Sequence, residues 1–310
     1  MSEHARVVCL FGPTASGKTD LAIELYQSGK FEIISVDSAL VYREMNIGTA
    51  KPNALELEQA PHHLIDVINP DESYSASSFS DDANVLIKEI HARNKIPLLV
   101  GGTFLYFRAL LQGLAKLPEA DPDIRAALEA EANDKGWRAL HERLARLDPA
   151  AAARIHENDQ QRIQRALEVY EITGTSLSSL LTKQTPTMLG FKPYKCALLP
   201  SDRAVLHARI EQRFKLMLEI GLIEEVQGLI EKWQLDESHM SMRSVGYRQV
   251  LHFLNGEYDK ETLIHKGVVA TRQLAKRQFT WLRSEQDLTL FDPLHVKTTA
   301  ISEAILEAML

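Results

Sequence analysis

The chain has 310 residues with a formal net charge of −7, and 45% of its residues are hydrophobic and 25% are charged. These values are typical of a globular protein with one large or two modest domains, and no apolar run approaches the ~20 residues of a membrane helix. The polar start, Met1 to Arg6, leaves no room for a signal or transit peptide, so we expect a cytosolic protein. Cys9 and Cys196 fall in apolar, strand-like runs, which argues for reduced core residues and against a disulfide framework or a zinc site.

The first element is a glycine-rich loop between a strand and a helix. Residues 7–11 are apolar throughout, as in a buried parallel strand, and residues 20–26 have a helical pattern. Between them, Gly12-Pro13-Thr14-Ala15-Ser16-Gly17-Lys18-Thr19 fits the phosphate-binding pattern G-x-x-x-x-G-K-[ST]. In such a loop backbone N–H groups converge on phosphate oxygens, the lysine contacts the outer phosphates and the Ser/Thr hydroxyl ligates Mg²⁺. An ordinary glycine turn is the alternative, and the flanking strand and helix favour the phosphate site.

The first third of the chain alternates strand-like and helical segments. Further apolar runs lie at 31–36, 64–68 and 97–100, and a helical pattern covers 77–93. This order predicts an α/β protein with a parallel sheet and helices on both faces. Ligands in such sheets bind beyond the carboxyl ends of the strands. We therefore expect the loop 12–19, Asp37 and Gly101–Thr103 to converge.

From about residue 116 the pattern becomes helical. Amphipathic stretches at 121–136, 137–147 and 159–173 have no strand between them, a loop follows at 173–193, and 194–199 is again strand-like. The sequence thus predicts a discontinuous P-loop α/β core at 1–115 and 196–310, with an all-helical insertion domain at 116–195. Beyond residue 200 it predicts helices at 202–220, 222–233, 244–254 and 260–283, a strand at 288–291 and a closing helix at 300–309.

One segment near the C-terminus is basic. Residues 238–283 have a net charge of +5, which leaves −12 on the rest of the chain. At 100° per residue the end of the last long helix separates into an apolar side and a side with Arg272, Lys276, Arg277 and Arg283, and no acidic residue interrupts that basic side. Both a merely solvated face and contact with a phosphate backbone are open.

After the loop 12–19, Asp37 is the second feature of the sequence that indicates phosphate chemistry. It follows an apolar strand, as does the Mg²⁺-holding aspartate of many nucleotide hydrolases. A carboxylate at this position could equally be a general base aimed at an acceptor across the cleft. The pattern alone leaves both roles open.

Eight sequence blocks, in order and over nearly the whole chain, resemble the motifs of the tRNA dimethylallyltransferases, also called tRNA isopentenyltransferases. They are Gly12–Thr19, Asp37-Ser-Ala-Leu-Val-Tyr42, Asn46–Pro52, Pro61–Asp66, Gly101–Thr103, Asn158-Asp159 with Arg162 and Arg165, Arg243–Arg248 and Thr271–Gln278. The absence of cysteines for a C-terminal zinc finger, as found in eukaryotic relatives, makes the chain look like the bacterial form. The family transfers a dimethylallyl group from dimethylallyl diphosphate to the exocyclic amine of the adenosine 3′ of the tRNA anticodon. Diphosphate is released and Mg²⁺ is required.

The resemblance implies a role for each motif. Asp37 would be the base that takes the amine proton, and Thr14, Ser16, Lys18 and Thr19 would contact the diphosphate, with Thr19 helping to hold Mg²⁺. Arg213 matches a family arginine at the same diphosphate, although a plain surface arginine is the alternative. Thr103 would contact the target nucleotide. The family usually has glycine after that threonine, and Phe104 in its place makes the shape of the pocket there an open question.

The resemblance also implies a set of tRNA contacts and a monomeric protein. Besides Asp37 and Thr103, the tRNA-contacting residues would be Ser38, Ala39, Leu40, Arg125, Gln161, Arg162, Ile163, Gln164, Arg165, Arg243, Ser244, Val245, Gly246, Tyr247, Arg248, Arg272, Lys276, Arg277 and Arg283. Tyr42, Tyr106 and Tyr247 could stack on bases or belong to the core.

Two other functions fit part of the pattern. A small-molecule or nucleoside kinase would also use the loop 12–19 and Asp37, but no arginine-rich lid follows the sheet in the sequence. A tRNA-binding protein with a regulatory nucleotide site would need no prenyl donor. Separate incubations with ATP and with dimethylallyl diphosphate distinguish these functions, because a kinase ignores the allylic donor and a binding protein transfers no prenyl group.

Overall fold

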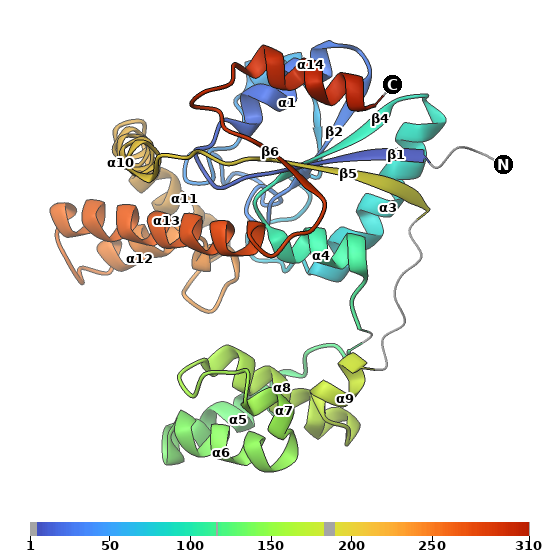
Figure 1. Ribbon diagram of the computed structural model, residues 1–310. Coiled ribbons are helices and arrows are strands. Elements are labelled where there is room, and N and C mark those ends of the chain that lie inside the picture. The colour runs from blue at the N-terminus through green and yellow to red at the C-terminus, as the bar shows by residue number, and fades with distance from the viewer. Residues whose placement is uncertain (1–4, 116, 183–189, 310) are drawn as a thin grey trace. The chain divides into compact units, whose positions relative to one another are not determined.

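The centre of the molecule is a six-stranded, all-parallel sheet, seen in a computed structural model that describes residues 5–115, 117–182 and 190–309 (Figure 1). Its strands are β1 (Ala5–Phe11), β2 (Phe31–Val36), β3 (His62–His63), β4 (Ile96–Gly101), β5 (Phe191–Leu198) and β6 (Leu288–Phe291). They lie in the order β3-β2-β4-β1-β5-β6. Residues 7–11 of β1 and 97–100 of β4, the two central strands, are apolar because both faces of such a sheet are covered. The predicted α/β class with a parallel sheet is confirmed.

Helices cover both faces of this sheet. On one face lie α1 (Lys18–Gln27) and α14 (Thr298–Ala308), and on the other lie α3 (Ala76–Ala92) and α4 (Phe104–Gln112) (Figure 1). Leu21 and Leu25 of α1 are buried against Val8 and Leu10 of β1. Each such fully buried side chain stabilises the fold by about 1.5–3 kcal/mol. Cys9 and Cys196 are free thiols in the buried parts of β1 and β5, as the sequence predicted.

The C-terminal helices form a second core beside the sheet. They are α10 (Arg203–Glu219), α11 (Leu222–Trp233), a 3-10 turn at Ser241–Arg243, α12 (Tyr247–Leu254) and α13 (Lys260–Leu282). Glu225 of α11 accepts N–H bonds from the backbone of Asn46, Ile47 and Gly48, at 3.1, 2.8 and 3.3 Å, and accepts from the Tyr247 hydroxyl at 2.5 Å. The loop that follows β2 is therefore fixed to the C-terminal helices. A short helix, α2 (Ala54–Gln59), continues that loop.

The chain divides into two compact units, residues 1–111 with 188–310 and residues 112–187. The second unit holds α5 (Pro122–Lys135), α6 (Trp137–Leu147), α7 (Pro149–Ala152), α8 (Gln160–Thr173) and α9 (Leu177–Thr182). It has its own apolar core, which includes Leu128, Leu140, Leu144, Ile163 and Leu167. Because β5 begins at Phe191, residues 191–195, which the sequence analysis assigned to the insertion, belong to the sheet.

Several element predictions need correction. The strand predicted at 64–68 is wrong: β3 is the preceding pair His62–His63, and Leu64 and Asp66 have φ of 62° and 56°, which a strand does not allow. The helix predicted from residue 244 begins at Tyr247, after Gly246 at φ 94°. The predicted loop 173–193 contains α9, and its residues 183–189 lie outside the described part of the chain. No helix among the described residues has the length and apolarity needed to cross a membrane.

Candidate active site

The sheet register brings three strand ends to one place. Phe11, the last residue of β1, and Val36, the last residue of β2, are both register partners of Gly101 at the end of β4. A Cβ on Gly101 would lie 2.0 Å from the Val36 carbonyl oxygen, so only glycine allows this close approach. The segments that follow these strands, starting at Gly12, Asp37 and Gly102, therefore leave the sheet at the same edge.

The phosphate loop between β1 and α1 has the expected geometry. Ala15 and Gly17 have φ of 63° and 91°, and Gly17 directly precedes α1. The free N–H groups of the first turn of a helix favour an anion at this position. Gly12 has no room for a side chain, because a Cβ there would lie 2.8 Å from Ser16 Oγ. Lys18 Nζ donates to the Pro13 carbonyl at 2.7 Å, which holds the lysine along its own loop.

A pocket of 140 Å³ joins the predicted phosphate-contacting residues to Asp37. It is lined by Thr14 to Asp20, by Asp37 and Leu40 after β2, and by Arg213 of α10. Arg213 was expected at this site only by resemblance, and the fold brings it there from some 190 residues away in the chain. The remaining lining includes Ser35, Thr49 and His62, which the sequence analysis did not single out as site residues. His62 has Nδ1 2.6 Å from the Ala60 carbonyl oxygen, and burial lowers its pKa, which favours the neutral ring.

Two charged groups dominate the pocket. Burial raises the pKa of the Asp37 carboxyl, while the Ala39 N–H, donated to Oδ1 at 2.8 Å, and the Lys18 charge favour its ionised form. Burial lowers the pKa of Lys18 to about 8, with the Asp37 charge opposing that shift and Arg213 adding to it. Opposed shifts of this kind are typical of functional sites. A carboxylate whose pKa is raised is also a stronger base than an exposed aspartate.

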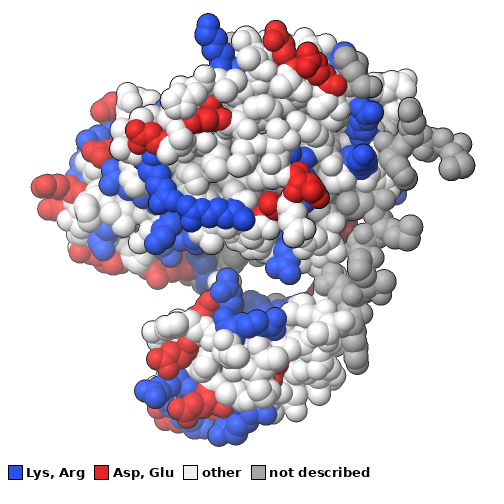
Figure 2. Space-filling view, in the orientation of Figure 1, with Lys and Arg blue, Asp and Glu red and all other residues white. Residues whose placement is uncertain are grey.

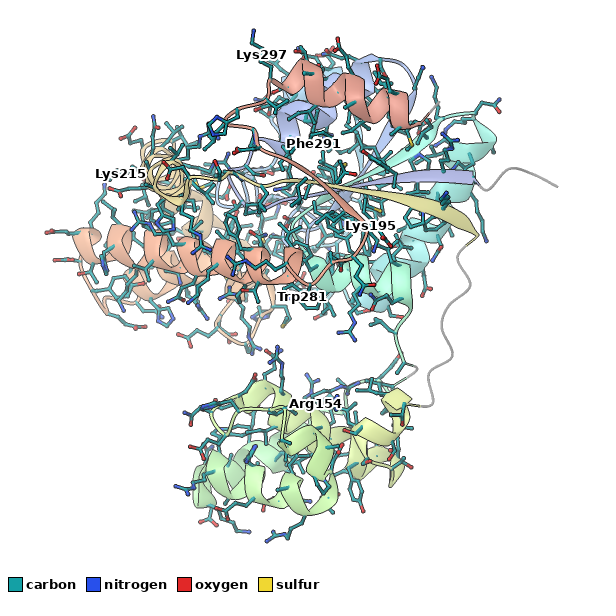
Figure 3. The ribbon with its side chains drawn as sticks, in the orientation of Figure 1. Arg154, Lys195, Lys215, Trp281, Phe291 and Lys297 are labelled. Carbon is teal, nitrogen blue, oxygen red and sulfur yellow. The ribbon has the colours of Figure 1, made fainter. Side chains whose placement is uncertain are left out.

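Thr103 supports the turn that carries Asp37. Its Oγ1 accepts the Ser38 N–H at 3.0 Å, and its own N–H donates to the Val36 carbonyl at 3.2 Å. Phe104, which replaces the family's usual glycine, is buried between two aromatic rings. Its ring stacks on Phe11 at 5.8 Å and on Trp281 at 6.0 Å, and Figure 3 labels Trp281 at the end of α13 close to α4. The Phe104 side chain therefore fills the core.

The side chains predicted to contact tRNA in the first unit differ in exposure. Ser38 is exposed beside the half-buried Ala39 and Leu40. Arg243 and Arg248 are exposed, Ser244 and Val245 are half-buried, and Gly246 and Tyr247 are buried. The Tyr247 side chain belongs to the core, as do Tyr42 and Tyr106, so the prediction that Tyr247 contacts tRNA through its ring does not fit the structure.

The basic face of α13 is present in the fold. Lys276, Arg277 and Arg283 are exposed, and Figure 2 shows Lys and Arg side chains gathered over the region where Figure 1 places α13. The expectation that nothing acidic interrupts this face needs one correction. Glu211 of the neighbouring helix α10 lies 3.1 Å from Arg272 Nη2, a contact that the helix's own sequence could not reveal.

In the second unit, the predicted contacts surround a buried carboxylate. Arg125, Gln161 and Arg162 are exposed, Gln164 and Arg165 are half-buried, and Ile163 is buried in that unit's core, where its side chain cannot face a partner. Glu168, fully buried, accepts from Arg125 Nε at 2.8 Å, from Arg165 Nη1 at 2.6 Å and from the Asp121 N–H at 3.0 Å. These partners orient two of the predicted arginines.

The pocket contains oxygens suited to a magnesium ion and a diphosphate. Thr19 lines it, and the hydroxyls of Ser16 and Ser35, also in its lining, are buried without a hydrogen-bond partner among the described residues. Buried polar groups are normally paired, so their partners here would be a ligand or water. Magnesium is usually held by one or two protein oxygens together with substrate phosphates, and this donor set fits it.

Known proteins place the chain in a family. The model of the family described as "IPP transferase" matches residues 40–285. The chain belongs to the IPP transferase family. It is 56% identical over 288 residues to a tRNA dimethylallyltransferase of Methylobacillus flagellatus, covering 93% of this chain and 91% of that one. It is 58% identical over 277 residues to the same enzyme of Thiobacillus denitrificans, covering 89% and 88%.

Solved structures of the IPP transferase family have the same fold. The full-length tRNA isopentenylpyrophosphate transferase of Bacillus halodurans superposes with a TM-score of 0.71 at 38% identity, covering 98% of this chain and 96% of that one. A eukaryotic dimethylallyltransferase acting on tRNA gives a TM-score of 0.79 at 28% identity, covering 98% and 80%.

One residue of the site escaped the sequence analysis as a functional candidate. Gln278 of α13 is buried, and its side chain reaches the phosphate loop and the turn after β4. A signal was available, because at 100° per residue Gln278 falls among the apolar positions of α13. A polar residue on the apolar side of a helix needs a buried partner, and here the partners are backbone groups of the site.

Proposed function

We propose that this protein transfers a dimethylallyl group from dimethylallyl diphosphate to N6 of the adenosine 3′-adjacent to the anticodon of tRNA, releasing diphosphate. The observation that carries the proposal is the single pocket in which the phosphate loop, Asp37 and Arg213 meet. A loop that cradles phosphates supplies the donor site, and a carboxylate at its edge supplies a base for the acceptor. Membership of the IPP transferase family, and relatives named for this activity, support the choice of donor and acceptor.

The chemistry follows from the charges of the pocket. As the adenine N6 forms a bond to the allylic carbon, the C–O bond to the diphosphate breaks and its electron pair stays with the diphosphate. Lys18, Arg213 and the N–H groups of the loop stabilise that developing charge. The amine is a weak nucleophile because its lone pair is delocalised into the ring. Asp37 accepts a hydrogen bond from N6, orients it and takes its proton.

Magnesium would be held by the Thr19 hydroxyl together with diphosphate oxygens. When bound, the ion neutralises part of the negative charge of the diphosphate. Loss of transfer after chelation of divalent ions, with recovery when Mg²⁺ is restored, is the expected sign of this requirement.

The acceptor base must leave the anticodon loop to reach Asp37, so the protein must hold the flanking nucleotides. Exposed cations on α13, together with Arg243 and Arg248, supply contacts to phosphates from the first unit. Arg125, Arg162 and Arg165 supply them from the helical unit, which we propose as a tRNA-contacting insertion. The protein is expected to act as a monomer on one tRNA.

Mass spectrometry of nucleosides tests the proposal. The protein is incubated with unmodified tRNA, Mg²⁺ and dimethylallyl diphosphate, and the digested tRNA is examined. We expect one adenosine per susceptible tRNA, the one 3′ of the anticodon, to carry an added isopentenyl group. A parallel reaction with ATP in place of the donor should give no phosphorylated product. An unaltered tRNA, or phosphate transfer from ATP to a nucleoside or other metabolite, would overturn the proposal in favour of a kinase or a binding protein.

Donor binding should depend on pH through Lys18. In the free protein the pKa of Lys18 is about 8, so the lysine is charged below that pH and loses its proton above it. Bound diphosphate favours the charged form, so above pH 8 binding requires uptake of a proton. The Kd of dimethylallyl diphosphate, measured by calorimetry without tRNA, should be constant below about pH 7 and rise up to ~10-fold per unit above 8.

The matched control for this pH dependence is Lys18→Met. It removes the titrating group, so its weaker binding should be flat across the same range. A wild-type Kd that does not change between pH 7 and 9.5 would contradict the role given to Lys18.

Removing one cation of α13 should weaken tRNA binding and its salt dependence. Arg277 is exposed and makes no ion pair with any described residue. We expect Arg277→Ala to lower tRNA affinity ~10-fold at low salt and to reduce the slope of log K against log salt by roughly 0.7–0.9, the value of one phosphate contact. Lys260→Ala, at the other end of the same helix, is the control and should leave the slope unchanged. Equal slopes for both variants would remove Arg277 from the tRNA interface.

A further inference from the structure

Gln278 joins three parts of the molecule that are far apart in the sequence. Its Oε1 accepts the Thr14 N–H of the phosphate loop at 2.9 Å, and its Nε2 donates to the Gly102 carbonyl at 3.0 Å. Because Thr14 offers a donor and Gly102 an acceptor, only one orientation of the amide satisfies both. The side chain is 7% exposed, so it has little access to water as a substitute partner.

The backbone around Gln278 is adapted to this contact. A Cβ on Gly102 would lie 2.2 Å from Gln278 Nε2, so any other residue would push the amide out. Trp281, one turn later on α13, stacks on Phe104 of α4, and Leu282 is buried in the core between α3, α4 and the sheet. This end of α13 therefore packs against the elements that carry the strand ends of the site.

The same turn of α13 faces solvent with cations. Lys276 and Arg277, the two residues before Gln278, are exposed. One helical turn therefore carries a surface proposed to bind tRNA phosphates on one side and a direct contact to the donor loop on the other. Glutamine is a costly residue for the apolar side of a helix, and a packing role alone would be met by methionine or leucine.

We propose that Gln278 is a positioning residue that couples tRNA binding on α13 to diphosphate binding in the phosphate loop. This inference rests on the proposed function, because it needs tRNA on the helix and a diphosphate in the loop. A tRNA that fixes the end of α13 also fixes Gln278, which in turn holds the Thr14 amide, and with it the loop, in the geometry for the donor. By thermodynamic reciprocity, a filled loop then tightens tRNA binding by the same factor.

The test is a binding cycle that involves no reaction. The Kd of inorganic pyrophosphate is measured with and without saturating unmodified tRNA, and the Kd of tRNA with and without pyrophosphate. For the wild type we expect each ligand to tighten the other at least 5-fold. Gln278→Met keeps the side-chain volume and removes both hydrogen bonds. In this variant the ratio of each ligand's Kd without and with the other ligand should fall to near 1. The affinity for tRNA alone should stay within 2-fold of the wild-type value. Gln227→Met, an exposed glutamine on α11, is the matched control and should keep the wild-type factor.

A second variant separates positioning from folding. In Gln278→Glu the ionised carboxylate can accept from Thr14 but repels the Gly102 carbonyl, whereas the protonated acid restores both hydrogen bonds. Coupling in Gln278→Glu should therefore be lost at pH 8 and return as the pH falls, relative to the wild type at each pH. A role of Gln278 that does not depend on these two hydrogen bonds would not give this recovery.

The outcomes distinguish the inference from the function on which it rests. If each ligand still tightens the other in Gln278→Met as it does in the wild type, the coupling role is wrong and the proposed function stands. The same holds if the wild type transfers the prenyl group but neither ligand changes the Kd of the other. If the wild type neither binds tRNA nor modifies it, the proposed function fails first. If Gln278→Glu shows no recovery at low pH, the two hydrogen bonds of Gln278 do not carry the coupling and the inference is wrong.

Discussion

Asp37→Asn should lower the rate of prenyl transfer at least ~100-fold while tRNA affinity stays near that of the wild type. The carboxamide keeps an oxygen to accept the Ala39 N–H, so the turn after β2 is preserved. It cannot take the proton of N6, which removes the base from the reaction. The effect should appear in the single-turnover rate constant with tRNA and donor saturating, because saturation removes any difference in binding. Asp37→Ala should show a similar or larger loss.

The pH dependence of the transfer rate gives a second test of Asp37 as the general base. Burial raises the pKa of Asp37, so transfer by the wild type should fall on the acid side at a higher pH than an exposed aspartate would give. Asp71→Asn, an exposed carboxylate of the same unit, is the control and should keep the wild-type rate and profile. An Asp37→Asn enzyme with more than a tenth of the wild-type rate would rule out general-base catalysis by this residue.

Much of the fold could be predicted from periodicity. The runs of Val, Ile and Leu in β1, β2 and β4 are characteristic of strands covered on both faces, and the amphipathic patterns located α3, α5, α6, α8 and α10 to within a few residues. β3 could not be predicted, because a two-residue strand has no period and its His62–His63 sequence has no strand preference. The apolar run that follows it, at 64–68, is not a strand, because Leu64 and Asp66 have positive φ.

Site residues that belong to one continuous motif could be predicted from the sequence. Site residues brought in from distant parts of the chain could not. A phosphate loop binds through its own backbone, so the pattern of residues 12–19 is complete in the sequence. Asp37 and Thr103 could be expected nearby because the carboxyl ends of parallel strands share one edge of the sheet. Arg213, Gln278 and the Glu211 that neutralises Arg272 reach their places only through packing of the C-terminal helices. No spacing rule relates residues that are 61 or 264 positions apart, as Glu211 is from Arg272 and Gln278 from Thr14.

Residues of one predicted tRNA-contacting segment differ in burial, and the fully buried side chains cannot contact RNA. Ile163 and Tyr247 lie inside segments predicted to contact tRNA, yet both are fully buried. A motif marks a segment, and within a helix only the positions on the outer face can touch a partner. Tyr247 instead donates its hydroxyl to Glu225, which also holds the backbone of Asn46 to Gly48. Its contribution is to hold the loop after β2, while Arg243 and Arg248 remain available for RNA.

Glu168→Ala should destabilise the helical unit by about 1.5–3 kcal/mol, because it removes the buried carboxylate that two arginines and a backbone N–H share. Glu168 is fully buried and accepts from Arg125, Arg165 and the Asp121 N–H, so it joins α5, α8 and the segment before α5. Hydrogen exchange on the full chain should show lost protection in α5 and α8 with the sheet unaffected. tRNA affinity should fall as well, since Arg125 and Arg165 lose the group that orients them.

The direction in which the stability of the helical unit changes with pH shows how Glu168 stabilises it. Burial alone would raise the pKa of Glu168, but the bonds from Arg125, Arg165 and Asp121 outweigh it and the pKa is lowered. The stabilisation is therefore complete above the unfolded value of about 4.3 and is lost as the pH falls through the lower folded value. Glu142→Ala, an exposed glutamate of α6, should change protection by less than about 0.5 kcal/mol. Equal effects of the two substitutions would mean that the arginines are held by other contacts, and that their orientation toward tRNA owes nothing to Glu168.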